Sequence, residues 1–230
     1  MNSDNESIRV LILGIGNVLW ADEGFGVRAV EALHRQYEFP ANVTLMDGGT
    51  QGIYLVHHVQ EADVLVVFDA VDYGLPPATL KRIEGDDVPK FLGAKKVSLH
   101  QTGFQEVLAM AEMLGSCPQH LLLVGVQPVE LEDYGGSLRP AVKAQMGPAI
   151  DLALEYLAQH GVAGQLRTQP LSEDAPLGIV AYENQRPSEQ LACRMGDDRV
   201  LLSEDFVVEP RPVPLDDGAI SVDVDHRGKY

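Results

Sequence analysis

The stretch Val64-Leu65-Val66-Val67-Phe68-Asp69 is an apolar run closed by a carboxylate. A short, continuous run of β-branched and large apolar side chains is typical of a strand buried on both faces of a sheet. Similar runs occupy residues 9–13 and 120–126, and segments with helical periodicity separate the three. Because strands that alternate with helices form parallel sheets, we expect an α/β fold: a three-layer sandwich with a mostly parallel twisted sheet and helices on both faces.

The remaining pattern gives the order of the other elements. Apolar spacing predicts helices at 25–37, 52–60, 102–114 and 141–160, and strands at 43–46, 79–83 and 96–99. We expect the strand at 79–83 to lie at an edge of the sheet. After Gly161, which suits a helix end, the composition changes.

Two regions are expected. Residues 1–163 form the α/β domain, and residues 164–230 form a proline-rich, acidic C-terminal extension. The extension has short apolar pieces and no long amphipathic helix, so we expect it to be poorly ordered and to contribute little to the core.

The bulk composition restricts the class of function. The formal net charge is −17, which repels phosphate backbones and anionic lipid, so no nucleic-acid or membrane partner is expected. The apolar runs are too short to span a bilayer. The two cysteines lie far apart in sequence and the N-terminus lacks the features of a signal peptide, so we expect a cytoplasmic protein.

Three acid or base residues follow predicted strands or their loops: Glu23, Asp69 and His100. The carboxyl ends of parallel strands face the ligand crevice of an open α/β sheet, so these side chains are expected to converge. Two carboxylates and an imidazole suit a divalent transition metal, such as nickel or zinc.

Each of these residues also has an ordinary structural explanation. Glu23 could simply complement the dipole of the helix that follows it, and Asp69 or His100 could cap a helix. Gly14 and Gly16 invite a dinucleotide-binding interpretation, but Leu19 replaces the third glycine of that fingerprint. The acidic residues of the same loop would also repel a pyrophosphate.

Several motifs together resemble the [NiFe]-hydrogenase maturation endopeptidases over residues 8–162. They are Gly14-Ile15-Gly16-Asn17-Val18-Leu19, Asp22-Glu23-Gly24-Phe25-Gly26-Val27, Asp47-Gly48-Gly49-Thr50, Asp69-Ala70, Ser98-Leu99-His100-Gln101-Thr102-Gly103 and Leu123-Val124-Gly125-Val126-Gln127-Pro128.

The resemblance implies a hydrolase that cuts a short C-terminal peptide from the precursor of the hydrogenase large subunit after nickel insertion. It also implies that Glu23, Asp69 and His100 contact the nickel and carry the catalytic site. The metal would arrive with the precursor, as a mark of a completed substrate. Whether cleavage is of aspartyl type or metal-dependent stays open.

Two other functions stay open at this point. The chain could be a non-catalytic nickel-binding chaperone that only inspects the precursor, because the residues reveal no unambiguous nucleophile. A nucleotide-dependent oxidoreductase is disfavoured by Leu19 and the acidic loop.

Overall fold

The computed structural model describes residues 8–89, 99–172 and 178–185, with side chains for all of these except 99–103. All of the described residues belong to one compact unit, Met1–Met195. None of the described helices is long and apolar enough to cross a membrane.

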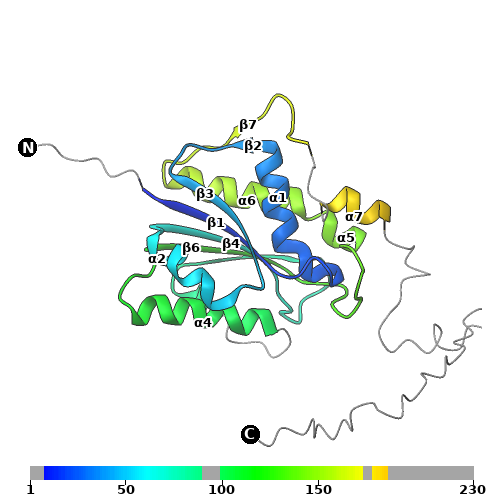
Figure 1. The fold of residues 1–230 in the computed structure, drawn as a ribbon, viewed down its shortest axis with the longest axis horizontal. Coiled ribbons are helices and arrows are strands. Elements are labelled where there is room, and N and C mark those ends of the chain that lie inside the picture. Colours follow the sequence, from blue (N-terminus) through cyan, green and yellow to red (C-terminus); the bar gives the residue numbers. More distant parts are fainter. Residues whose placement is uncertain (1–7, 90–98, 173–177, 186–230) are drawn as a thin grey trace, which may run out of the picture. The chain divides into compact units, whose positions relative to one another are not determined.

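A five-stranded sheet forms the middle layer, in the order β3-β1-β4-β6-β5 (Figure 1). The first four strands in this order run parallel, and β5 pairs antiparallel with β6 at the edge. The strands are β1 (Val10–Ile15), β3 (Val43–Gly49), β4 (Val64–Ala70), β5 (Leu80–Glu84) and β6 (His120–Val126). The mostly parallel sheet and the edge strand are as predicted.

Helices cover both faces of this sheet, which confirms the three-layer sandwich. In Figure 1, α1 (Phe25–Gln36) and α6 (Met146–Gln159) lie on one side, and α2 (Val56–Glu61) and α4 (Leu99–Met113) lie on the other. Alternate strand residues serve the two faces: Val66 and Phe68 pack with α1 and α6, whereas Leu65 packs with α2 and α4. Residues 64–68 of β4 and 121–126 of β6 are therefore all apolar, because neither face of these strands meets water.

Three elements differ from the sequence prediction. The helix expected at 52–60 begins as the 3-10 turn η2 (Gly52–Leu55) and is α-helical only in α2. The helix expected at 141–160 is two helices, α5 (Pro140–Lys143) and α6. The break has a physical cause, since Pro148 has no N–H and fits only the first turn of α6. The strand expected at 96–99 is also wrong at its end, because Leu99 is the first residue of α4. Residues 96–98 lie outside the described part of the chain.

Two described segments follow the boundary expected after residue 163. In the first, β7 (Gln165–Leu166) pairs antiparallel with β2 (Tyr37–Glu38). In the second, α7 (Ile179–Gln185) places Glu183 against Lys143, with Nζ to carboxylate distances of 2.8 and 2.9 Å. These segments contact the α/β domain, so they differ from the loose appendage expected here. The extension beyond residue 185 stays a prediction.

A glycine pair brings α1 against the sheet. A Cβ on Gly14 would meet the carbonyl oxygen of Gly26 at 2.4 Å, and a Cβ on Gly26 would meet the carbonyl oxygen of Phe68 at 2.1 Å. No side chain fits between these backbones. The turn that precedes α1 is thereby held next to the carboxyl end of β4.

Candidate active site

Asp69 is the centre of the candidate site. It is the sixth residue of β4, and it is 3% exposed at the carboxyl edge of the sheet. Burial raises the pKa of its carboxyl group well above the usual value, although the backbone amide of Ala70 opposes this by hydrogen bonding. Its Oδ2 atom has no hydrogen-bond partner among the described residues. A buried oxygen of this kind is costly unless a ligand completes it.

Glu23 lies beside Asp69, in the short 3-10 turn η1 (Ala21–Gly24) between β1 and α1. Burial raises the pKa of Glu23 to about 7. The charge of Glu23 also raises the pKa of Asp69, so the two carboxyl groups are electrostatically coupled. The structure therefore brings Glu23 and Asp69 to the same end of the sheet, and their role as site residues stays a prediction.

The third predicted residue, His100, is the second residue of α4. Because α4 ends a few residues before β6 begins, its C-terminal end lies at the amino edge of the sheet and its first turn lies toward the carboxyl edge. The backbone thus places His100 toward the same edge as Glu23 and Asp69. Its side chain lies outside what the structure describes, so its convergence with the carboxylates stays a prediction.

The donor set fits a divalent cation. Two coupled carboxyl groups that are both destabilised by burial would be relieved by a positive charge between them. Among the side chains that the structure describes, no three His, Cys, Asp or Glu residues are grouped as a metal site requires. Glu23 and Asp69 would therefore need further ligands, either from His100 or from the substrate.

Asp22 is a structural residue of the site that the sequence prediction missed. Its carboxylate is fully buried and accepts backbone hydrogen bonds from Val129 (2.8 Å), Glu130 (2.9 Å) and Arg139 (2.7 Å). These amides belong to the loop that follows β6. Asp22 therefore fixes the Glu23 turn to that loop. The only signal in the sequence was the pair of adjacent acidic residues, which gave no reason to assign different roles to Asp22 and Glu23.

A second missed group lies on the other side of Asp69. Gln127, at the end of β6, accepts hydrogen bonds from the amides of Tyr73 (2.7 Å) and Leu75 (3.1 Å) and donates one to Asp72 (2.9 Å). Burial, and then the charge of Asp69, raises the pKa of the Tyr73 phenol. Gln127 thus orders the loop that places a phenol close to the candidate carboxylates. A polar residue directly after a buried strand was the available signal.

Asp47 lies at the carboxyl end of β3, within the Asp47-Gly48-Gly49-Thr50 motif. Burial raises the pKa of Asp47, and both the amide of Gly49 and the charge of Arg28 oppose that rise. The same edge of the sheet therefore carries a third carboxylate that burial disfavours.

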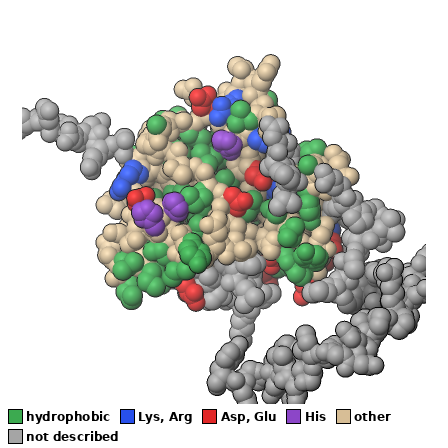
Figure 2. Space-filling model, viewed as in Figure 1, with side chains coloured by type: hydrophobic (Ala, Val, Ile, Leu, Met, Phe, Trp, Pro, Cys, Tyr) green, Lys and Arg blue, Asp and Glu red, His purple; other side chains and the backbone are tan. Residues whose placement is uncertain are grey.

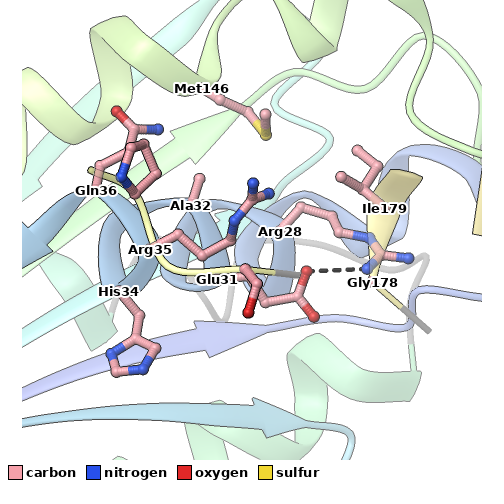
Figure 3. Close-up of a pocket in the computed structure, with 11 residues that line it drawn as sticks. Arg28, Glu31, Ala32, His34, Arg35, Gln36, Met146, Gly178 and Ile179 are labelled. Carbon is pink, nitrogen blue, oxygen red and sulfur yellow. Dashed lines mark hydrogen bonds and ion pairs between the residues drawn. The ribbon is translucent and has the colours of Figure 1, made fainter. Parts of the chain in front are cut away.

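A cavity of about 420 Å³ lies away from these carboxylates, along α1 (Figure 3). Arg28 and Glu31 form an ion pair of 2.9 Å at its wall, and the Nε atom of Arg35 donates to the carbonyl oxygen of Leu171 at 3.2 Å. Neither Glu23 nor Asp69 lines it. The cavity therefore belongs to the junction between α1 and the C-terminal segments.

Figure 2 shows how charged and apolar side chains are distributed over one face of the molecule. On the face shown in Figure 2, the described Lys and Arg side chains are scattered and form no continuous patch. Hydrophobic side chains gather over one end of α4 in the same view, where Met113 is 78% exposed and Leu114 is 56% exposed.

Comparisons with known proteins identify the family. Residues 27–156 match the family model described as hydrogenase maturation protease. The hydrogenase expression/formation protein HupD of Thiocapsa roseopersicina is 65% identical over 209 residues, which cover 88% of this chain and 93% of HupD. The hydrogenase 2 maturation protease of Escherichia coli K12 is 40% identical over 156 residues, covering 67% of this chain and 94% of that protein.

The fold comparison agrees with the sequence comparison. The solved structure of the hydrogenase maturating endopeptidase HybD from Escherichia coli matches with a TM-score of 0.67 and 38% identity, over 70% of this chain and 99% of HybD. The rest of this chain is therefore additional to the HybD fold. On these matches, the chain belongs to the hydrogenase maturation protease family.

Proposed function

We propose that this protein is the endopeptidase that removes the C-terminal peptide of a [NiFe]-hydrogenase large-subunit precursor after nickel insertion. The family supplies the reaction class, a hydrolase acting on a peptide bond. We further propose that it acts in the cytoplasm, as its cysteine content suggests.

One observation carries the nickel part of the proposal. The Asp69 carboxylate is buried, lacks a hydrogen-bond partner for Oδ2 among the described residues, and lies beside the coupled carboxyl group of Glu23. In the protein without substrate, the state in which both of these carboxyl groups are ionised is therefore disfavoured. A precursor that carries a dication would compensate both charges, whereas a nickel-free precursor would not.

In this proposal nickel is part of the substrate. Glu23, Asp69 and His100 would hold it, and zinc-like ions would fit the same oxygen and nitrogen donors. Bound nickel would supply a positive charge near the peptide to be cut. The protein would contribute a rigid turn for Glu23, exclusion of water from Asp69, and a carboxyl group able to exchange a proton near neutral pH.

The alternative is a non-catalytic nickel-binding chaperone that only inspects the precursor. The family assignment favours the protease, and a direct assay separates the two. Purified protein is incubated with nickel-loaded precursor, and the mass of the precursor is measured before and after. Loss of the C-terminal peptide supports the protease, and an unchanged mass with stable binding supports the chaperone.

Two controls test the role of nickel and of the third ligand. Nickel-free precursor should stay uncut, and equal cleavage of both forms would contradict nickel recognition. His100→Ala should abolish cleavage while leaving the thermal midpoint nearly unchanged, because truncation in the first turn of a helix costs little stability. Cleavage by this variant at the rate of the unmodified protein would remove His100 from the site.

A further inference from the structure

The two loops that border Glu23 carry a pair of aromatic rings at their surface. Trp20 ends the loop after β1, and Tyr134 lies in the loop after β6. Their ring centroids are 5.2 Å apart in an edge-to-face arrangement. Tyr134 is 48% exposed, and Val129 of the same loop is 47% exposed. The rings therefore form an apolar surface that the core does not use.

The backbone holds this surface rigidly. Trp20 and Tyr134 form an antiparallel β-bridge, and the amide of Gly135 donates to the carbonyl oxygen of Leu19 at 2.7 Å. The buried Asp22 carboxylate joins the same two loops a few residues away. A loop fixed in this way presents its exposed side chains without the loss of freedom that a mobile loop would suffer on binding.

The aromatic pair lies next to the turn that carries Glu23. The amide of Glu23 donates to the carbonyl oxygen of Trp20 at 2.9 Å, so a single turn separates the aromatic ring from the candidate carboxylate. A peptide bound with its scissile bond at Glu23 would therefore lie close to this turn. Aromatic rings on rigid supports are typical anchors for such segments.

We propose that Trp20 and Tyr134 form the docking platform for the segment of the precursor that adjoins the bond to be cut. The proposal rests on the proposed function for its partner. The segment would bind as an extended peptide and place an apolar side chain on the two rings. Glu130 and Glu132 lie in the same loop as Tyr134, so an acidic segment would be repelled and an uncharged or basic one accepted.

The first test separates docking from turnover. Tyr134→Ala should raise KM for nickel-loaded precursor about tenfold with little change in kcat, because an aromatic contact is lost from substrate binding. Tyr134→Phe keeps the ring and should behave like the unmodified protein. Met113→Ala, which truncates an exposed apolar side chain at the end of α4, is the matched control. An unchanged KM for Tyr134→Ala, or a loss confined to kcat, would overturn the platform.

The second test needs no cleavage. Trp20 is the only tryptophan of the chain, so its fluorescence reports on this surface. A synthetic, tryptophan-free peptide that copies the C-terminal end of the precursor should change the emission, and Tyr134→Ala should weaken that binding about tenfold. Binding detected by calorimetry without a change in emission would overturn the proposal.

The two tests also separate this proposal from the function beneath it. If the unmodified protein leaves the precursor uncut but the peptide changes Trp20 emission, the proposed function fails and the platform stands. If cleavage is normal and Tyr134→Ala leaves KM unchanged, the function stands and the platform fails.

Discussion

Acidic side chains at the two edges of the sheet differ in their exposure to solvent and in their hydrogen bonds. At the amino edge, Asp63 is 39% exposed and accepts a hydrogen bond from the amide of Arg9 at 2.8 Å. At the carboxyl edge, the Asp69 carboxyl group is almost fully buried and its Oδ2 atom has no hydrogen-bond partner among the described residues. The carboxylate of Asp63 at the amino edge thus has a hydrogen-bond partner within the chain. The carboxylate of Asp69 at the carboxyl edge is buried, and burial disfavours its ionised form. That difference marks the carboxyl edge as the place where a ligand is needed.

The difference also appears within the carboxyl edge. Asp22 is as buried as Asp69, yet three backbone amides satisfy it. Burial alone therefore does not identify the reactive group. The distinction between Asp22 and Asp69 lies in their partners, and the following substitutions test it from the largest expected effect to the smallest.

The largest effect is expected for Asp69→Asn. The substitution keeps the shape of the side chain but removes the negative charge, so cleavage of nickel-loaded precursor should fall by a factor of about 100 or more. The thermal midpoint should not fall, and at pH 9 it should rise, because burial penalises the ionised carboxylate. The cleavage rate is measured from the change in precursor mass, and the thermal midpoint is measured by calorimetry. Full activity, or a clear loss of stability, would show that Asp69 belongs with the satisfied carboxylates.

Asp22→Asn should give the opposite pattern. An amide cannot accept three backbone hydrogen bonds as the carboxylate does, and its NH₂ group would face at least one of these N–H donors. We expect the free energy of unfolding to fall by about 2–4 kcal/mol, measured by urea denaturation. Asp63→Asn at the amino edge is the matched control, with an expected loss below about 1 kcal/mol. Equal losses in the two variants would remove the contrast between the edges.

Glu23 should make the metal-free protein less stable as the pH rises. Its pKa is raised from 4.5 to about 7 in the folded state, so the folded protein binds more protons than the unfolded chain between these values. Stability from this group is therefore present below pH 4.5 and is lost as the pH rises toward 7. Glu23→Gln should flatten this part of the curve of thermal midpoint against pH. An identical slope in both proteins would mean that Glu23 is solvated like an ordinary surface residue.

The smallest effect is expected at the amino edge and has the opposite sign. His160 lies 4.3 Å from His120, ring centroid to ring centroid. Burial, and then the charge of His120, lowers the pKa of His160, while Glu84 partly opposes this. The folded state therefore resists protonation, and stability is lost as the pH falls below 6.5. His160→Gln should slightly reduce this loss of stability at low pH. A change in the pH dependence as large as that caused by Glu23→Gln would contradict the contrast between the two edges of the sheet.

The sequence was sufficient to predict the layers and the position of Asp69. Both follow from continuous apolar runs, whose ends in a parallel sheet define one edge. It was insufficient for Asp22 and Gln127, whose partners are backbone amides contributed by loops without a sequence pattern of their own. The strand end predicted at Leu99 was wrong because a short apolar run fits a strand or the start of a helix equally well.

The bonds of Asp22 also determine when the site is complete during synthesis. Its amide partners lie 107, 108 and 117 residues further along the chain. The Glu23 turn therefore gains these three bonds only after Arg139 has emerged from the ribosome, although Glu23 itself emerges early. A nascent chain should thus carry its acidic residues in an incompetent arrangement until most of the domain has been made.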